Sequence, residues 1–196
     1  IDFVAPRKIH EIIPSSTGNF IWVNKSGVHF PYPIRYPQAA GVWRPVLKDN
    51  GYDYHQYLEI SNSYDNSILY NVDRSFEELI GADGLPPNTV IIYTSDHGQT
   101  LSENGESWPH SGTTRSEACV PLFIVQNPGL QADISYKASH ANIFATLLDY
   151  MRVPPEARAY AYAPSLLTAR ASDSAPRRYI FGTFDSYYGS VVYPFD

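Results

Sequence analysis

The sequence predicts an α/β fold with a mostly parallel β-sheet. Short apolar runs of strand length alternate along the chain with longer stretches in which apolar residues recur every three or four positions. One of the runs, residues 89–94, carries apolar side chains at successive positions. Such a strand has both faces covered, which is typical of the centre of a parallel sheet with helices on each side.

The expected strands are apolar segments rich in β-branched and aromatic residues, at 19–24, 89–94, 121–125 and 178–182. Between the first two, a proline-rich loop runs from Phe30 to Pro45, and no regular element can extend far through it. Residues 155–177, rich in Ala, Pro, Ser and Arg, are expected to form a surface connection.

Two helices are predicted from their apolar periodicity. The first starts at an N-cap among residues 61–63 and ends at Gly81, since glycine commonly terminates helices. The second is capped by Ser139 and stops before Pro154. Its apolar stripe consists of Ile143, Phe144, Leu147, Leu148 and Met151.

Composition narrows the class of protein. The 196 residues suffice for one sizeable core, and no segment is long and apolar enough to cross a membrane. Fourteen Lys and Arg against twenty Asp and Glu give a net charge of −6, which leaves no basic surface for nucleic acid. A single Cys119 excludes an intramolecular disulfide and a cysteine-based zinc cluster. The only methionine is Met151, so we expect that the sequence has lost its beginning.

The most informative residues are Asp96 and His97, which directly follow the predicted strand 89–94. Open α/β sheets bind ligands at the carboxyl ends of their strands. A carboxylate beside an imidazole there provides ligands suited to Zn²⁺ or Mn²⁺, and Gly98 allows the backbone to turn sharply. The alternative is an aspartate that caps a helix beside an incidental surface histidine.

A longer ordered series of motifs surrounds this pair. Ser95-Asp96-His97-Gly98 is followed by Glu103-Asn104-Gly105, by His110, and by Val120-Pro121-Leu122. The order resembles the sulfatase and phosphoethanolamine-transferase branch of the alkaline phosphatase superfamily. Three further segments are similar to parts of that family: a His-x-Pro loop, the helix before the Asp-His strand, and a late helix, at 28–37, 64–73 and 139–149.

The resemblance implies an alkaline-phosphatase-like three-layer sandwich and metal-dependent hydrolysis or transfer of a phosphate or sulfate ester. Asp96 and His97 would hold the divalent metal, with zinc the expected ion and manganese or calcium the alternatives. His29 and His110 would act as catalytic, substrate-side groups that stabilise the transferred group or complete a second metal site. Lys25 would place an ammonium on the same anion, the alternative being a solvated loop lysine.

The sequence also departs from the family pattern. Asn142 stands where an aspartate is usual, and Ser111 separates His110 from the glycine that normally follows it. Glu103 is expected to order the loop after the metal ligands, whereas His10, His55 and His140 match no family position.

The family's nucleophile and an early acidic metal ligand lie ahead of the His-x-Pro loop, and neither has a counterpart here. The sequence contains no Cys-x-Pro-x-Arg motif. The resemblance therefore implies that 1–196 is the C-terminal portion of a sulfatase-like catalytic domain, inactive by itself. Its partners would be a phosphate- or sulfate-ester substrate, such as a lipid or glycan, and a missing N-terminal part that could carry a membrane anchor. The location would be extracytoplasmic, on the periplasmic side of the bacterial inner membrane.

Other classes of function have less support in the sequence. No Gly-x-Ser-x-Gly elbow or P-loop motif is present, which excludes serine hydrolases and P-loop nucleotide enzymes of the usual kind. The remaining alternative is a non-catalytic module that binds a glycan, a lipid headgroup or a protein through its aromatic loops. A bound divalent metal at Asp96 and His97 would separate the two.

Overall fold

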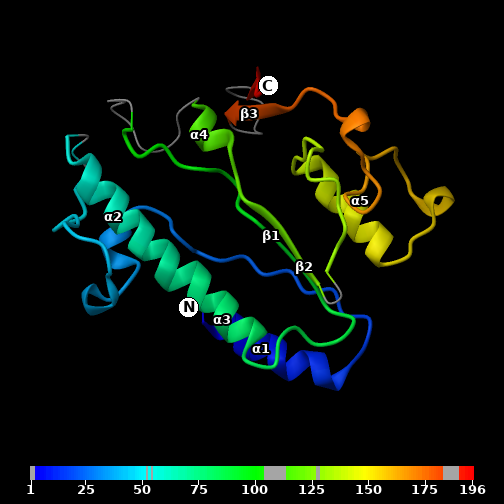
Figure 1. The fold of residues 1–196 in the computed structure, drawn as a ribbon, viewed down its shortest axis with the longest axis horizontal. Helices are drawn as coiled ribbons and strands as arrows, with labels where there is room; N and C mark the ends of the chain where they lie inside the picture. Colours follow the sequence, from blue (N-terminus) through cyan, green and yellow to red (C-terminus); the bar gives the residue numbers. More distant parts are fainter. Residues whose placement is uncertain (1–2, 52, 54, 104–113, 127–128, 183–189) are drawn as a thin grey trace. The chain divides into compact units, whose positions relative to one another are not determined.

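The computed structural model describes residues 3–51, 53, 55–103, 114–126, 129–182 and 190–196. The chain forms two compact units. The first comprises Ile1–Pro87 and Thr100–Gly112, and the second comprises Asn88–Gln99 and Thr113–Asp196. Figure 1 traces the helices and strands of each unit along the sequence.

The first unit is helical. A short helix, α1 (Val4–Ile12), leads into the turn η1 (Ile13–Ser15). A long helical stretch consists of α2 (Tyr57–Ile68), a π-helical turn η4 (Leu69–Asp73) and α3 (Arg74–Ile80), which follow one another without a break (Figure 1). This stretch confirms the predicted helix and its end at Gly81, whose φ is +64°. It begins earlier than predicted, because the expected capping residues 61–63 lie inside α2.

The proline-rich loop between Phe30 and Pro45 is confirmed, since it contains only the 3₁₀ turns η2 (Tyr32–Ile34) and η3 (Gln38–Ala40). A loop without a strand partner needs other groups to satisfy its backbone. The polar face of α2 provides them: Asn66 Oδ1 accepts hydrogen bonds from the backbone nitrogens of Val42 and Trp43, at 2.7 and 3.1 Å. Buried polar residues of α2 therefore stabilise this loop.

A small apolar core holds the loop against α2. Tyr32, Leu47 and Ile60 are buried, and the partly buried side chains packed on them are Val28, Phe30, Tyr64 and Leu101. The core thus joins both segments of the first unit, because Leu101 belongs to the short second segment.

The prediction of a strand at residues 19–24 is wrong. These residues form neither strand nor helix, and the side chains of Phe20 and Trp22 are 57% and 78% exposed. A strand needs a hydrogen-bonded partner, which an apolar composition alone does not supply.

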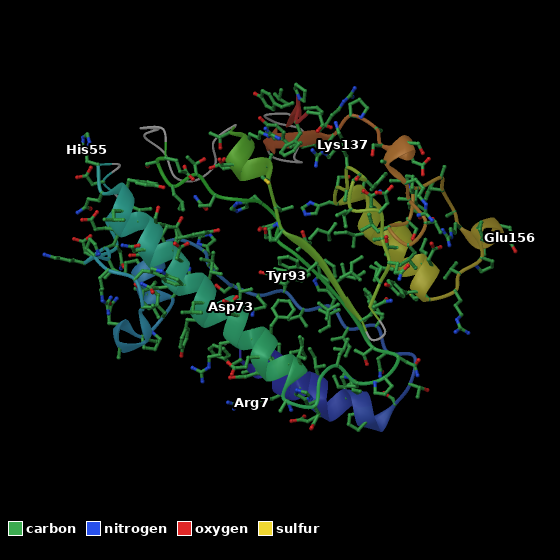
Figure 2. All side chains as sticks on the ribbon, viewed as in Figure 1. Arg7, His55, Asp73, Tyr93, Lys137 and Glu156 are labelled. Carbon is green, nitrogen blue, oxygen red and sulfur yellow. The ribbon has the colours of Figure 1, made fainter. Side chains whose placement is uncertain are left out.

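The second unit contains two strand pairs. β1 (Val90–Thr94) pairs with β2 (Leu122–Gln126), and β3 (Arg178–Gly182) pairs with β4 (Ser190–Pro194). Three of the predicted strands are thereby confirmed. Tyr93, labelled in Figure 2, stacks on Phe123 of the opposite strand with 6.0 Å between ring centroids.

A parallel sheet is not confirmed, because both strand pairs in the described part of the chain are antiparallel. A parallel pair requires a long crossover connection, usually a helix. Between β1 and β2 the described residues contain only the single-turn helix α4 (Arg115–Ala118). The covering expected for a central strand is also missing, since β1 is only half-buried along its length.

The late helix is confirmed as α5 (Ala141–Tyr150), which begins after His140. Its buried residues are Asn142, Ala145 and Thr146, while Phe144 and Met151 of the predicted apolar stripe are mostly exposed. The connection from 155 to 177 contains only the short turns η5 (Pro155–Ala157) and η6 (Ala171–Asp173). Among the described residues, no helix has the length and apolar character that a membrane span requires.

Candidate functional site

Asp96 and His97 lie in the loop that leaves the carboxyl end of β1. Local hydrogen bonds fix this loop. Asp96 Oδ1 accepts a hydrogen bond from the backbone nitrogen of His97 at 3.0 Å, and Ser95 Oγ donates to the His97 carbonyl at 2.9 Å. The carboxylate of Asp96 and the backbone of His97 are therefore held in one defined arrangement.

The imidazole of His97 is oriented by its neighbour. Its Nδ1 lies 2.6 Å from the carbonyl oxygen of Gly98. A carbonyl only accepts, so Nδ1 carries a proton, and in the neutral ring Nε2 is then the nitrogen with the lone pair. Metal-binding histidines commonly donate one ring nitrogen to a carbonyl in this way, which orients the other ring nitrogen for the metal. The donor set of Asp96 and His97 thus fits Zn²⁺ or Mn²⁺.

Gly98 is required for close packing rather than for the sharp turn expected from the sequence. Its backbone nitrogen donates to the Glu117 carbonyl at 2.6 Å. A Cβ at this position would lie 2.1 Å from the Ser116 carbonyl oxygen and 2.4 Å from that of Cys119. The loop after Asp96 and His97 therefore lies directly against the backbone of α4 and its C-cap, Cys119, and any side chain would displace it.

In the described part of the chain, no group of three or more His, Cys, Asp and Glu side chains is arranged so that it could hold one metal ion. Asp96 and His97 could supply two ligands. Glu103, which was expected to order the following loop, accepts a hydrogen bond from the backbone nitrogen of Leu101 at 2.9 Å.

His29 lies in the first unit, in the loop before η2. Its Nδ1 is 2.6 Å from the Phe30 carbonyl oxygen, so Nδ1 is the donor of this contact, as in His97. Arg35 clamps this loop, because its Nε donates to the His29 carbonyl at 2.5 Å and its Nη2 donates to the Phe30 carbonyl at 3.3 Å.

Lys25 also belongs to the first unit, and its ammonium donates to the Asn71 carbonyl oxygen at 2.7 Å. The lysine is half-buried, so the alternative of a fully solvated loop residue does not describe it. His110 lies outside the described residues. Lys25 and His29 thus fall in the first unit, and Asp96 and His97 in the second.

Asn142, the departure from the family pattern, is 1% exposed, and its side chain makes polar contacts through both its oxygen and its nitrogen. Its Nδ2 donates to the Pro164 carbonyl and the Tyr136 hydroxyl, at 2.8 and 2.9 Å, and its Oδ1 accepts from the Ser139 nitrogen at 2.8 Å. Pro164 offers only an acceptor there, so an amide fits where an ionised carboxylate would be repelled.

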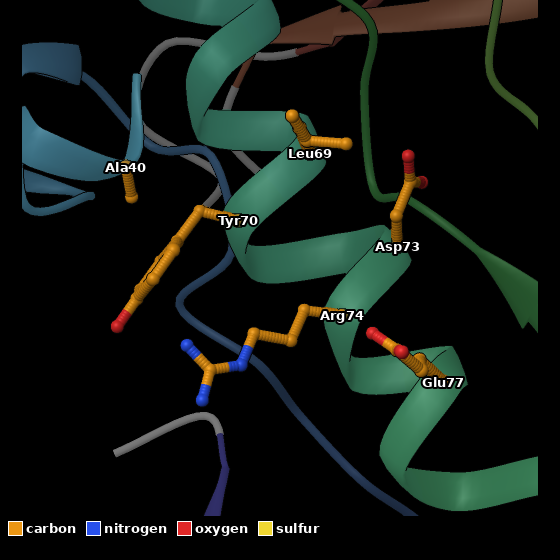
Figure 3. A pocket seen from close by; sticks show the side chains of 6 residues that line it. All are labelled: Ala40, Leu69, Tyr70, Asp73, Arg74 and Glu77. Atoms are coloured by element: carbon orange, nitrogen blue, oxygen red, sulfur yellow. The ribbon is translucent and has the colours of Figure 1, made fainter. Parts of the chain in front are cut away.

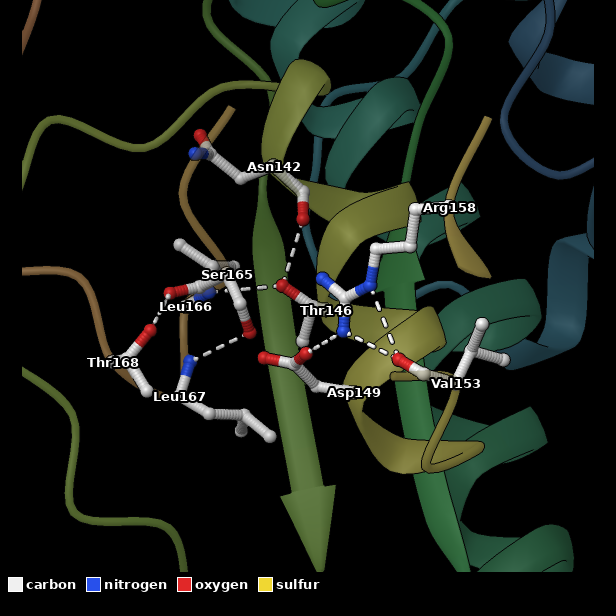
Figure 4. A network of polar contacts seen from close by, with 9 residues as sticks. All are labelled: Asn142, Thr146, Asp149, Val153, Arg158, Ser165, Leu166, Leu167 and Thr168. Carbon is white, nitrogen blue, oxygen red and sulfur yellow. Dashed lines mark hydrogen bonds and ion pairs between the residues drawn. The ribbon is translucent and has the colours of Figure 1, made fainter. Parts of the chain in front are cut away.

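The same helix carries a second polar group (Figure 4). Asp149 forms an ion pair with Arg158, which also donates to the Val153 carbonyl. A hydrogen bond from Ser165, followed by the one from Arg158, lowers the pKa of Asp149 below its usual value. Figure 4 also shows Thr146 between the Asn142 carbonyl and the backbone of Leu166. These contacts fix α5 against the connection that follows it.

A shallow depression of about 450 Å³ lies on the first unit (Figure 3). None of the predicted site residues lines it. Its Arg74 guanidinium is stacked on the rings of Tyr70 and Phe3, at 5.3 and 4.9 Å from their centroids, and pairs with Glu78 at 3.5 Å. The lining residues are Ala40, Leu69, Tyr70, Asp73, Arg74 and Glu77.

Sequence reasoning missed Arg35, Asn71 and His140. Arg35 follows His29 by six residues in the proline-rich loop, and this short spacing is the one signal in the sequence that its side chain could contact the loop around His29. No local sequence pattern marks Asn71, because its contact with Lys25 arises in a π-helical turn. His140 precedes α5 and contacts Thr94 on β1, a pairing that no local pattern indicates.

Comparison with known proteins places these residues in a family. A model of the sulfatase family matches residues 7–153, which include Lys25, His29, Asp96, His97 and His110. No solved structure matches. The chain spans about a quarter of the length of the curated relatives it matches.

Three relatives illustrate the range. The Kdo(2)-lipid A phosphoethanolamine 7''-transferase of Salmonella typhimurium is 33% identical over 134 residues, covering 66% of this chain and 22% of the relative. Phosphoethanolamine transferase EptA of the same organism is 29% identical, covering 63% and 24%. Arylsulfatase K of Gallus gallus is 34% identical, covering 57% and 22%. With three quarters of its length matched by the family model, this chain belongs to the sulfatase family.

Proposed function

We propose that this chain contributes to metal-dependent hydrolysis or transfer of a phosphate or sulfate ester, with phosphoethanolamine transfer as the reaction type. The observation that carries the proposal is the loop after β1, where the His97 ring is held by its Nδ1 hydrogen bond to the Gly98 carbonyl and the neighbouring Asp96 carboxylate accepts from the His97 backbone nitrogen. Membership of the sulfatase family supports the coarse chemistry. The names of two relatives, which specify phosphoethanolamine transfer, favour the finer assignment.

Asp96 and His97 would hold one divalent ion, for which zinc is the best match to an oxygen and an imidazole ligand. Such an ion lowers the pKa of a bound nucleophile and screens negative charge on the transferred group. His29, and His110 with it, would contact the oxygens of that group, and Lys25 would add a positive charge held in place by Asn71.

The nucleophile and the remaining metal ligands are proposed to come from residues outside this sequence. Support comes from the match of this chain to about a quarter of the length of each relative. On this proposal, 1–196 forms the C-terminal portion of a three-layer catalytic domain. Its location would be extracytoplasmic, at the periplasmic side of a bacterial inner membrane, with a lipid or a glycan as substrate.

A first experiment follows from the proposed division of the site. Purified 1–196 is incubated with Zn²⁺ and either p-nitrophenyl phosphate or p-nitrophenyl sulfate, and release of p-nitrophenol is measured. We expect no turnover above the metal-only control. Robust turnover that Asp96→Ala abolishes would contradict an external nucleophile while supporting the metal site, and turnover that Asp96→Ala leaves intact would contradict both.

A second candidate function is non-catalytic binding through exposed aromatic side chains. The specific observation in its favour is the side chain of Trp22, which is 78% exposed in a segment without regular structure. The absence of metal binding at Asp96 and His97 would favour this candidate.

A further inference from the structure

We infer that Arg35 is a further anion-binding residue beside His29, and that Asn71 positions it together with Lys25. The inference deepens the proposed function, on which it rests, by adding a guanidinium to the groups that would receive the transferred phosphate or sulfate. Four observations support it: the hydrogen-bond donors that Arg35 retains, its charge, its attachment to Asn71, and its distance from His29.

The first observation concerns the donors of Arg35. A guanidinium has five N–H groups. Nε donates to the His29 carbonyl at 2.5 Å, Nη1 donates to Ser26 Oγ at 3.1 Å, and Nη2 donates to the Phe30 carbonyl at 3.3 Å. Three donors thereby hold the loop, and one N–H remains on each Nη for another acceptor.

The second observation concerns charge. All three bonded acceptors of Arg35 are neutral, and no carboxylate among the described residues pairs with it. Arg74 and Arg177 differ, because they pair with Glu78 and Asp196. An uncompensated guanidinium attracts an anion from solution.

The third observation is that one buried residue connects two cations. Asn71, 6% exposed, accepts the Lys25 ammonium on its backbone oxygen at 2.7 Å. Its Nδ2 donates to the backbone oxygen of Arg35 at 2.9 Å and to that of Ser67 at 3.0 Å. Asn71 lies in the π-helical turn η4, and such turns within helices occur frequently at functional sites.

The fourth observation places Arg35 at the histidine. Its Nη2 lies 3.5 Å from His29 Nδ1, which itself donates to Phe30. The guanidinium and the imidazole thus occupy the same side of one short loop. A tetrahedral oxyanion suits this pair, because guanidinium donors on two nitrogens match two oxygens of a phosphate or sulfate.

The test is titration of 1–196 with inorganic phosphate at constant ionic strength and with EDTA present. Binding is followed by ¹H–¹⁵N NMR signals of the arginine Nε–H groups and of the backbone at 26–35. Sodium sulfate is titrated separately to compare the two anions. We expect saturable shifts at these signals, and phosphate binding weakened about tenfold in Arg35→Gln, since a charge-assisted hydrogen bond contributes about that factor. Arg35→Lys, which keeps the charge and loses the fork, should lose less.

Two matched controls sharpen the test. Arg44 lies in the same unit and donates to the Gln38 backbone at 2.8 Å, so Arg44→Gln should leave phosphate binding unchanged. Asn71→Leu should weaken phosphate binding. Asn62→Leu should not, although it removes the hydrogen bond from this α2 residue to the Pro45 carbonyl.

The inference is overturned if wild type shows no saturable phosphate binding, or if folded Arg35→Gln and Arg35→Lys both bind as wild type does. It is equally overturned if Arg44→Gln weakens binding as much as Arg35→Gln, since the effect would then be one of general surface charge. Because EDTA removes metal, a failure of the proposed metal site leaves this result unaffected.

Discussion

His140 Nε2 lies 3.0 Å from Thr94 Oγ1, and this contact ties the start of α5 to the carboxyl end of β1. The Thr94 hydroxyl is also 3.3 Å from the Ser95 carbonyl, to which it can only donate. The histidine is then the donor to the hydroxyl oxygen. Thr94 lies two residues before Asp96, so this hydrogen bond holds the end of the strand that leads into the loop with the candidate metal ligands.

Removal of this link should reduce stability moderately. Thr94→Val keeps the shape of the side chain and loses the hydroxyl, which should lower the free energy of unfolding by about 1 kcal/mol. Urea denaturation of Thr94→Val, His140→Ala and the double variant measures the coupling between the two residues. Strictly additive effects would contradict a direct hydrogen bond.

Gly98→Ala adds only one methyl group but should destabilise the protein measurably. The new methyl group would lie within 2.4 Å of two carbonyl oxygens, at Ser116 and Cys119, so the loop must move. We expect a loss of about 1–3 kcal/mol in the free energy of unfolding, as for other overpacked positions. Gly129→Ala is the matched control, since a Cβ there meets nothing within 4 Å. Equal stability of the two variants would argue against the close packing of Gly98.

Asn142→Asp should destabilise the protein in a pH-dependent way. The variant replaces a buried amide donor with a carboxylate that faces the Pro164 carbonyl, so burial should raise the pKa of the new carboxyl group in the folded state. A raised folded pKa means that the stability of the variant is retained at low pH and lost as pH rises past about 4 towards that pKa.

The magnitude at neutral pH should be about 2–4 kcal/mol, measured by urea denaturation between pH 4 and 8. Asn50→Asp, at an exposed position, provides the control and should behave as wild type does. A loss of stability in Asn142→Asp that is the same at every pH would exclude the charge as its cause.

Asp149 should contribute to stability with the opposite pH dependence. Hydrogen bonds from Ser165 and Arg158 lower its pKa in the folded state. Its contribution is therefore fully present above the unfolded pKa of about 3.9 and is lost as pH falls through the folded value. Asp149→Asn should reduce stability at pH 7, and the difference from wild type should shrink as the pH falls below about 4. A constant difference would contradict the role of the ionised carboxylate, and Asp83→Asn provides an exposed control.

The sequence carried enough information to locate most elements but not their partners. Residues 89–94 and the late helix have strong local patterns, and both elements form close to their predicted positions. Trp22 lies in an equally apolar segment that forms no strand, because pairing depends on a neighbouring strand rather than on composition. The antiparallel pairing of β1 with β2 likewise could not be read from either strand alone.

Within the candidate site, Asp96 and His97 were identified because a recognisable motif surrounds them, and the hydrogen bond that fixes the His97 ring is a contact with the next residue. Asn71 and His140 could not be found in this way. Each acts through a partner more than 35 residues away in the sequence, Lys25 in one case and Thr94 in the other. Such pairings depend on tertiary structure, which no local pattern encodes.

The measurement that tests the central claim most directly is zinc binding by 1–196, followed by equilibrium dialysis with and without a chelator. The account predicts weak but saturable binding of one Zn²⁺ per chain, because the remaining ligands are proposed to lie outside this sequence. Binding should be lost in Asp96→Ala and in His97→Ala and retained in His10→Ala, whose ring contacts the Glu78 carbonyl in the other unit. Zinc binding that persists unchanged in folded Asp96→Ala and His97→Ala variants would contradict the assignment of these residues as a metal site.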